Sequence, residues 1–366
     1  MATQTHATRS ERPRDVAIMV KRCMAVGRPV MITGSPGIGK SELIAGIAKE
    51  QNRPVIDMRL LLCDPTDLKG LPYFCKEENT MKWAAPSELP KKDGPLANAI
   101  LFLDEINAAP PSVQAAAYQL ILNRRVGEYE LPDGVSMVCA GNRDTDKGVT
   151  YRMPSPLANR LVHIDMTFHF DDWQQWAIQS GVHPDVVGFL SQHKHKLFDF
   201  DPKSPSKAFA TPRSWVFVSQ LLDDNLPESI NTSLVAGTVG EGLGIEFAAH
   251  RRTASKMPAV EDVLTGKESK LKTKELSAMY SLTISMCYTL KEWAEKAKNK
   301  EDGMDIDVWH GYVDNFFRFM MDNFQTEMTV LGAKTSLRDF QLPINHRKLT
   351  TFSEFHDRYG KMILDI

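Results

Sequence analysis

The first half of the chain alternates short apolar runs with segments whose apolar residues recur at helical spacing. The apolar runs, which predict buried strands, are residues 29–33, 54–58, 99–103, 135–140 and 163–166. Between them, helical spacing predicts helices at 15–25, 40–51 and 111–123. Strands that are apolar throughout are typical of a parallel sheet covered on both faces. The pattern therefore predicts an α/β domain of three layers.

After residue 171 helical spacing dominates, which predicts a second part that is all-helical. The expected helices lie within 173–179, 185–193, 213–222 and 230–249, followed by two long amphipathic helices at 276–297 and 305–324. A lysine-rich segment at 267–274 separates these groups, and a polar, basic tail follows the last helix. We therefore expect a disordered segment at 1–13, an α/β domain at 14–170, an all-α domain at 171–265 and a helical extension at 266–366.

Three shorter segments have patterns of their own. Residues 64–95 are rich in Pro, Gly, Lys and Asp, which predicts a loop with little regular structure. Residues 125–131 and the turn at 132–134 predict a hairpin. The glycines at 237, 240, 242 and 244 fall inside a helical stretch, which favours close helix packing over a nucleotide loop.

Composition narrows the class of protein. The 366 residues carry a net charge of -2, so bulk electrostatics favour neither nucleic acid nor an anionic membrane. Five cysteines form no CxxC pair and have no histidine cluster at metal-ligand spacing, which indicates thiols in a reducing compartment. Residues 1–14 lack an apolar signal core, and no apolar run approaches the roughly 20 residues of a membrane span. We expect a cytoplasmic protein without a membrane segment.

One motif matches GxxxxGK[ST] in full and lies between a predicted strand and a predicted helix. Its residues are Gly34, Ser35, Pro36, Gly37, Ile38, Gly39, Lys40 and Ser41. The glycines let backbone N–H groups surround phosphate oxygens, and the helix that follows directs its positive dipole end toward them. Lys40 would reach the β- and γ-phosphates and Ser41 would hold Mg²⁺, so the motif predicts binding of ATP with Mg²⁺.

Polar residues end the next two buried strands. Asp104 and Glu105 follow the strand at 99–103, where a carboxylate pair emerges beside the phosphate loop. Asp104 would hold Mg²⁺ through water, and Glu105 would act as general base toward the attacking water. Asn142 ends the strand at 135–140 and would position that water against the γ-phosphate.

Two arginines complete the candidate site. Arg160 follows a short helix and would project into the ATP site of a neighbouring subunit, where a guanidinium stabilises the transferring phosphate. Arg213 follows a capped helix start in the second part of the chain and would reach back to the γ-phosphate. Four further arginines remain rivals of Arg160 for the contact between subunits: Arg152, Arg143, Arg124 and Arg125.

These motifs, in this order, resemble those of the AAA+ superfamily. In finer detail they resemble its MoxR-type branch, which also occurs as a dynein-related AAA module. The resemblance spans about residues 14–225 and is carried by GSPGIGKS, LFLDEIN, AGNRD, PSPLANR and ATPRSW, which begin at residues 34, 101, 140, 154 and 210. It implies a P-loop αβα core with a parallel sheet, followed by an all-α lid and a helical C-terminal extension. It also implies the roles given above for Lys40, Ser41, Asp104, Glu105, Asn142, Arg160 and Arg213.

The same resemblance implies partners and a mode of action. Members commonly form hexameric rings and often work with a partner that carries a von Willebrand factor A domain, remodelling or activating a target protein or inserting a metal. Residues 64–72 are similar to an insert that faces the central pore in that branch, as does a hairpin at about 125–131. That hairpin is short here, and the last hundred residues match no motif of the family.

Four hypotheses about function stay open. We expect first a ring-forming ATPase that remodels or activates a protein client. The main alternative is a switch or scaffold whose assembly, more than its turnover, depends on nucleotide. A DNA-acting ATPase would need a basic surface or a stacking platform, and the near-neutral composition disfavours it. A metal-chelatase subunit would take its metal site from a partner.

Overall fold

The computed structural model describes residues 9–146, 151, 153–271, 273–301 and 304–364. The chain divides into two compact units. The first comprises the residues up to 169 together with 201–204, and the second comprises 170–200 and 205–366.

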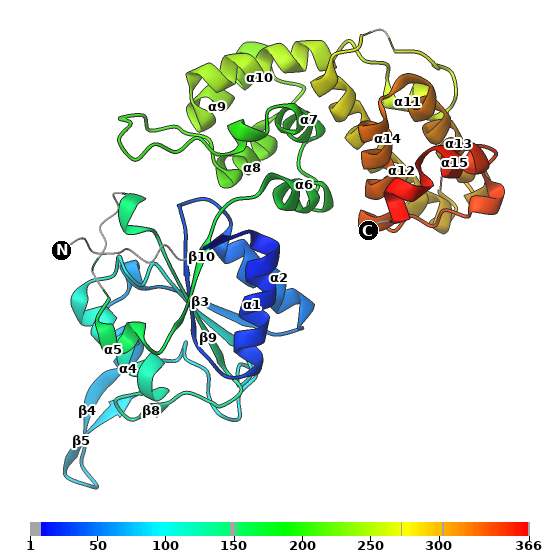
Figure 1. Cartoon of the computed structure of the whole chain (residues 1–366). Coiled ribbons are helices and arrows are strands. Elements are labelled where there is room, and N and C mark those ends of the chain that lie inside the picture. Colours follow the sequence, from blue (N-terminus) through cyan, green and yellow to red (C-terminus); the bar gives the residue numbers. More distant parts are fainter. Residues whose placement is uncertain (1–8, 147–150, 152, 272, 302–303, 365–366) are drawn as a thin grey trace. The chain divides into compact units, whose positions relative to one another are not determined.

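A parallel sheet of six strands forms the centre of the first unit (Figure 1). In spatial order the strands are β1 (Ser10–Glu11), β10 (Val162–Met166), β2 (Val30–Thr33), β9 (Ser136–Gly141), β6 (Ile100–Asp104) and β3 (Val55–Arg59). Every neighbouring pair is parallel. The predicted parallel α/β architecture is thereby confirmed.

Helices cover both faces of this sheet. On one side lie α1 (Pro13–Ala25) and α2 (Lys40–Glu50), which contact each other and, respectively, β10 and β6. On the other side α4 (Pro111–Asn123) packs against Leu101 and Leu103 of β6. Because successive strand residues point to opposite faces, the intervening Phe102 is buried on the side of α1 and α2. Burial of both faces explains why these strands are apolar throughout.

The register of the strands places the ends of three of them at one edge of the sheet. Thr33, the last residue of β2, is level with Gly141 of β9. On the far side of β9, Leu103 of β6 is level with Cys139. The segments that follow β2, β6 and β9 therefore emerge side by side, as the ends of parallel strands do in open α/β sheets.

The N-terminal segment is more ordered than we expected. Ser10 and Glu11 pair with Asp165 and Met166 as the edge strand β1, and α1 begins at Pro13. The prediction of disorder over 1–13 is wrong for this part, and residues 1–8 lie outside the described residues. Pairing with β10 and a hydrogen bond from Ser10 to Asp165 stabilise a segment that has no apolar pattern.

The segment expected to be a loop at 64–95 also contains regular structure. After a 3₁₀ turn (Leu60–Leu62), α3 (Pro65–Lys69) leads into an antiparallel hairpin of β4 (Leu71–Cys75) and β5 (Thr80–Ala84). The hairpin projects away from the central sheet (Figure 1). Cross-strand hydrogen bonds satisfy the polar groups of its backbone. Because both faces of the hairpin lie largely in solvent, its sequence lacks the alternation of apolar and polar residues by which a half-buried strand is predicted. The hairpin predicted near 125–131 is present as β7 (Arg125–Val126) and β8 (Tyr129–Glu130).

The second unit is helical, as predicted. Its first helices are α6 (Phe170–Gln179), α7 (Pro184–Gln192), α8 (Pro212–Leu221), α9 (Glu228–Val239) and α10 (Glu241–Ala254). Phe189, Trp215 and Phe247 contact one another in tilted and edge-to-face arrangements, with ring centroids 5.5–5.8 Å apart, and form the core of this part. The single helix expected at 230–249 is divided at Gly240, whose φ of 104° does not fit a helix.

The remaining helices of this unit form a second core. They are α11 (Val260–Leu264), α12 (Leu276–Asn299), α13 (Ile306–Asn323), α14 (Thr326–Lys334) and α15 (Phe352–Leu364), with a π-helical turn (Thr335–Asp339) after α14. The expectation of a polar tail after residue 324 is wrong. Phe355 of α15 is buried, with its ring centroid 4.7 Å from that of Phe317. Because charged residues alternate with the apolar ones in α15, the composition of this segment did not predict that one face of the helix is buried.

No helix in the described ranges combines the length and the apolar character needed to cross a bilayer.

Candidate nucleotide-binding site

The loop between β2 and α2 requires glycine at three positions. Gly37 and Gly39 have φ angles of 74° and 93°, in the region that L-residues rarely adopt. A Cβ on Gly34 would lie 2.7 Å from the carbonyl oxygen of Met166, so no side chain fits there. The glycine spacing of the motif therefore follows from the backbone path.

The start of α2 suits an anion. Gly39 is its N-cap and has no side chain to occupy the free N–H groups of the first turn. The helix is 11 residues long and directs its partial positive charge toward the loop. Free backbone donors and a helix dipole are the chemistry that binds phosphate, so the residues present fit a nucleotide.

Lys40 connects this loop to the end of β9. Its side chain is buried, and Nζ donates to the carbonyl oxygens of Gly34 at 2.7 Å and Ser35 at 3.0 Å. Nζ also donates to Oδ1 of Asn142 at 3.1 Å. The ammonium and the amide that we expected at the γ-phosphate are thus adjacent, although 102 residues separate them in the chain.

Ser41 and Asp104 bring two candidate oxygen ligands for Mg²⁺ together. Ser41 Oγ lies 3.4 Å from Oδ2 of Asp104, at the end of β6. A hydroxyl beside a carboxylate, both with access to the phosphate loop, is the oxygen donor set that Mg²⁺ prefers. These two residues would hold the ion, as the sequence predicted, and a bound Mg²⁺ would offset the negative charge of the phosphates.

Glu105 has an unusual backbone conformation. Its φ is 56°, and its N–H donates to Oδ1 of Asp104 at 2.9 Å. A left-handed conformation is costly for a residue with a side chain, and such positions cluster at functional sites. The turn places the two carboxylates side by side at the end of β6.

Among the candidate arginines, Arg160 is the exposed one that follows α5 (Ser155–Ala158). Within the described residues it makes neither an ion pair nor a hydrogen bond to the loop. Arg143 instead pairs with Asp165 at 2.8 Å, and Arg124 donates to the carbonyl of Val135 at 2.9 Å. Arg125 is exposed on the short hairpin. The remaining rival, at position 152, lies outside the described residues.

Arg213 belongs to the second unit, where it is exposed at the first turn of α8. Thr211 caps this helix by accepting a hydrogen bond from Ser214 N at 3.1 Å, and Pro212 occupies its first turn. The capping predicted for this helix is present. The structure thus brings Lys40, Ser41, Asp104 and Asn142 together in the first unit, with Glu105 adjoining them.

Sequence reasoning assigned no role to two residues near this edge. Asp57 lies in the middle of β3, where burial, reinforced by the Asp104 carboxylate, raises its pKa. A lone carboxylate inside an otherwise apolar strand was the available signal. Asn107 follows Glu105 by two residues and is buried. Its place in the motif LFLDEIN was visible, but its contacts were not.

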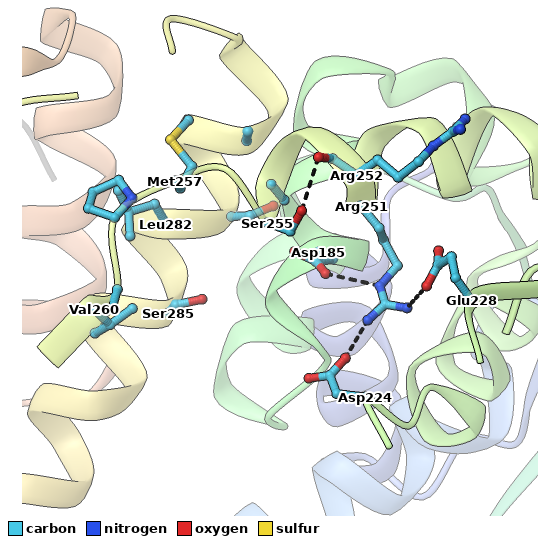
Figure 2. Close-up of a pocket in the computed structure, with 15 residues that line it drawn as sticks. Asp185, Asp224, Glu228, Arg251, Arg252, Ser255, Met257, Val260, Leu282 and Ser285 are labelled. Carbon is cyan, nitrogen blue, oxygen red and sulfur yellow. Dashed lines mark hydrogen bonds and ion pairs between the residues drawn. The ribbon is translucent and has the colours of Figure 1, made fainter. Parts of the chain in front are cut away.

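A second hollow, of about 570 Å³, lies within the second unit (Figure 2). There Arg251 of α10 contacts three carboxylates: Asp185 at 3.3 Å, Glu228 at 2.9 Å, and Asp224. Three carboxylates around one guanidinium offset its positive charge, so Arg251 is not available to a phosphate. A mostly buried arginine with such partners is better explained as a structural ion-pair cluster that joins α7, α9 and α10.

The chain matches one family model and is similar to several known proteins. Residues 29–163 match the family described as "ATPase family associated with various cellular activities (AAA)". Midasin of Giardia intestinalis is 27% identical over 173 residues, which is 43% of this chain but 3% of that protein.

Solved structures that are similar share little sequence. A point mutant of RuvB from Thermotoga maritima is 15% identical, with a TM-score of 0.36 over 64% of this chain and 66% of its own. NtrX of Brucella abortus in complex with ADP is 14% identical, with a TM-score of 0.39 over 83% of this chain and 68% of its own. At these scores we draw no argument from the structural likeness.

The family match spans the phosphate loop, the carboxylate pair and β9 with Asn142 directly after it, which are the elements that the sheet brings together. Over residues 29–163 the chain is similar to the AAA family of ATPases, in agreement with the resemblance of its motifs to the AAA+ superfamily.

Proposed function

We propose that this protein binds Mg-ATP and hydrolyses it as a subunit of a ring, hexameric as in the family, that remodels or activates a protein client. The observation that carries the proposal is the convergence of Lys40, Asn142, Ser41 and Asp104 at one sheet edge, with contacts of 3.1 and 3.4 Å between elements remote in the chain. This arrangement supports nucleotide binding with a metal.

The proposed chemistry assigns a role to each group of the first unit. The loop N–H groups and Lys40 bind the phosphates, and Ser41 and Asp104 hold Mg²⁺, which supplies charge neutralisation when bound. Glu105 accepts a proton from the attacking water, and Asn142 orients that water. We assign the transition-state contact from a neighbouring subunit to Arg160, which is exposed, whereas Arg143 and Arg124 are held by contacts within their own chain. Arg125 is exposed as well, but it lies on the short hairpin of β7 and β8, to which we assign a different role.

A client or partner surface is supported by the hairpin of β4 and β5. Its exposed apolar side chains are Leu71, Tyr73, Phe74, Met81 and Trp83. The second hairpin lies beside its base, since Trp83 N donates to Glu128 at 3.4 Å. By the family resemblance, residues 64–72, which lead into the first hairpin, and the second hairpin would face the pore of a ring. Exposed apolar residues there would contact a protein client. We also retain a partner with a von Willebrand factor A domain as part of the proposal.

The domain division belongs to the same proposal: a nucleotide-binding domain at 14–170, a lid at 171–265 and an extension at 266–366. The separation of the two compact units between His169 and Phe170 supports the first boundary. The lid and the extension share one compact unit. In this proposal Arg213 reports the state of the nucleotide to the lid.

The test measures ATPase rate against protein concentration, with particle size by light scattering, for the wild type and two variants. Glu105→Gln should retain ATP binding while turnover falls at least about 100-fold, the usual contribution of a positioned base. Arg160→Ala should lower turnover about 1,000-fold, as loss of an arginine finger does, and mixing with Glu105→Gln subunits should restore part of it. Arg125→Ala tests the other exposed candidate of the same unit and should keep wild-type turnover if Arg160 makes the contact.

Other outcomes would redirect the proposal. Turnover that is independent of concentration and unaffected by Arg160→Ala would refute the contact between subunits. Slow turnover together with large nucleotide-dependent changes in size would favour the switch or scaffold.

A further inference from the structure

Asn107 occupies a buried position in the turn that carries Glu105. Its side chain is 8% exposed, and Nδ2 donates to the backbone carbonyl of Asn142 at 2.7 Å. The backbone carbonyl of Asn107 accepts from Tyr151 N at 2.6 Å. One residue therefore contacts the turn after β6 and the segment after β9.

Beyond the end of β6, a side-chain hydrogen bond from Asn107 takes the place of the backbone hydrogen bonds that pair β6 with β9. The pairing of β6 with β9 runs as far as Leu103 and Cys139. Glu105 then turns the chain at a φ of 56°, and Ile106 N donates to the carbonyl of Ala140 at 3.1 Å. The next bond across this edge comes from the Asn107 amide. The turn is thus joined to the end of β9 by one backbone bond and one side-chain bond.

The fit around this amide is close and directional. A Cβ on Gly141 would lie 2.3 Å from Oδ1 of Asn107, so the amide fills the space that a side chain at 141 would need. Exchanging the amide oxygen and nitrogen would put two acceptors face to face at Asn142, so the hydrogen bond determines the orientation. Oδ1 is buried and, within the described residues, accepts no hydrogen bond. A buried acceptor without a partner is costly, so an apolar residue of similar size would serve packing alone better.

We propose that Asn107 is a positioning residue for ATP hydrolysis, which fixes the Glu105 carboxylate relative to the Asn142 amide. The inference rests on the proposed function. Asn142 in turn contacts Lys40, so a single set of contacts runs from the general base through Asn107 to the group expected at the γ-phosphate. A base and a water-orienting amide act together only at a fixed separation, and a displacement of about 1 Å can cost about 100-fold in rate.

The first test compares kcat and KM for ATP in Asn107→Ala. The variant should bind ATP with a KM close to the wild-type value while kcat falls about 10- to 100-fold, because the nucleotide contacts remain and the base is misplaced. Asn231→Ala is the matched control: Asn231 is 2% exposed and its Nδ2 donates to the carbonyl of Asp223 at 2.8 Å in the second unit. It loses this bond and the one that Asp223 N donates to its Oδ1 at 3.3 Å, and it should nevertheless keep wild-type kcat.

A second variant remains informative if Asn107→Ala folds poorly. Asn107→Asp has the same shape, but its ionised carboxylate faces the Asn142 carbonyl without a proton to donate. Burial raises the pKa of such a group, and its protonated form again offers a donor. The ratio of its kcat to that of the wild type should therefore rise as pH is lowered from 8 to 6, which loss of stability alone would not produce.

The outcomes separate the two proposals. Wild-type protein without ATP turnover would overturn both. Active wild type with an Asn107→Ala variant of normal kcat and reduced thermal stability would overturn the positioning role alone. A flat kcat ratio for Asn107→Asp across this pH range would show that the donated hydrogen bond is not what the reaction needs, and would overturn it as well.

Discussion

At the scale of single residues, the site depends on backbone conformations that only some residues adopt easily. Glycine supplies them in the phosphate loop, at Gly37 and Gly39. Glu105 adopts one despite its side chain, with a φ of 56°. The left-handed conformation costs an L-residue about 1–2 kcal/mol. The conformation of Glu105 thus lowers the free energy of unfolding, as expected if its carboxylate acts on the substrate.

The loss of unfolding free energy that this conformation causes can be measured by comparing two variants that both lack the carboxylate. Glu105→Gly should unfold with a free energy higher than Glu105→Ala by about 0.5–1 kcal/mol, because glycine removes the strain but gains freedom in the unfolded chain. Urea denaturation followed by circular dichroism gives both values. Equal stabilities, or a more stable alanine variant, would mean that the turn at Glu105 is not strained.

At the scale of elements, the helices of the second unit approach one another closely at positions where only glycine fits. Gly188 lies in α7 against α12, where a Cβ would come within 2.1 Å of Ser281 Oγ and 2.7 Å of Ser281 N. Gly244 of α10 similarly faces Ala236 of α9, with a Cβ at 2.8 Å. Of the four glycines at 237–244, Gly244 thus has the packing role that the sequence favoured, and Gly240 ends a helix. Gly237 and Gly242, in contrast, have no neighbour within 4 Å at their Cβ positions, so the packing prediction is wrong for them.

Alanine at two helical glycines should therefore have opposite effects. Gly188→Ala should lower the free energy of unfolding by about 1–3 kcal/mol, since the backbone of α12 must move. Gly237→Ala should raise it by up to about 1 kcal/mol through helix propensity. Tryptophan fluorescence during urea denaturation reports this unit, which contains five of the six tryptophans. A stabilising Gly188→Ala would contradict the packing of α7 on α12.

The same unit contains a buried histidine that should make it sensitive to acid. His250 of α10 lies between Ser277 Oγ at 2.9 Å and Ser281 Oγ at 3.2 Å. Burial, opposed by nearby Asp185 and reinforced by His193 and Arg251, lowers its pKa. Its neutral form is therefore the one that fits the fold.

The lowered pKa of His250 determines how the stability of the fold should depend on pH. The unfolded chain, with a histidine pKa near 6.5, takes up the proton more readily than the folded one, so the free energy of unfolding should fall as pH decreases below about 6.5. His250→Gln should reduce this slope between pH 7 and 5.5. His356→Gln, at an exposed position of α15, is the control and should leave it unchanged. An unchanged slope in His250→Gln would exclude His250 as the acid-sensitive group.

At the scale of the whole molecule, the chain is two compact units with separate cores. The first holds the nucleotide site, and the second holds five tryptophans, leaving Trp83 in the first. This distribution provides separate probes of the two units. In a Trp83→Phe variant, fluorescence reports the second unit alone, whereas circular dichroism reports both.

Mg-ATP should stabilise the first unit by mass action. At 100 times its Kd, the expected gain in unfolding free energy is about 2.7 kcal/mol, and Lys40→Ala should abolish it. If Arg213 contacts the nucleotide as proposed, the fluorescence transition of Trp83→Phe should also shift with Mg-ATP, and Arg213→Ala should remove that second shift. A shift seen by circular dichroism alone would leave nucleotide binding intact and contradict the role of Arg213.

The sequence by itself determined the parallel α/β core and the helical second unit, because buried strands and helix faces impose apolar periods that need no partner to be recognised. It also predicted the phosphate loop, since glycine spacing before GKS leaves few other backbone paths. It did not predict the β4–β5 hairpin or α15. Their stability comes from cross-strand pairing and from contacts with distant residues such as Phe317, which a local pattern does not contain.

Only the tertiary structure decided which polar residues meet. The strand order puts β9 between β2 and β6, so Asn142 contacts Lys40 on one side and Asn107 on the other. It also showed Arg143 and Arg124 to be engaged within the chain while Arg160 is exposed. A sequence records which residues are present, but hydrogen bonds between segments 35 and 102 residues apart exist only once the sheet has set their distance.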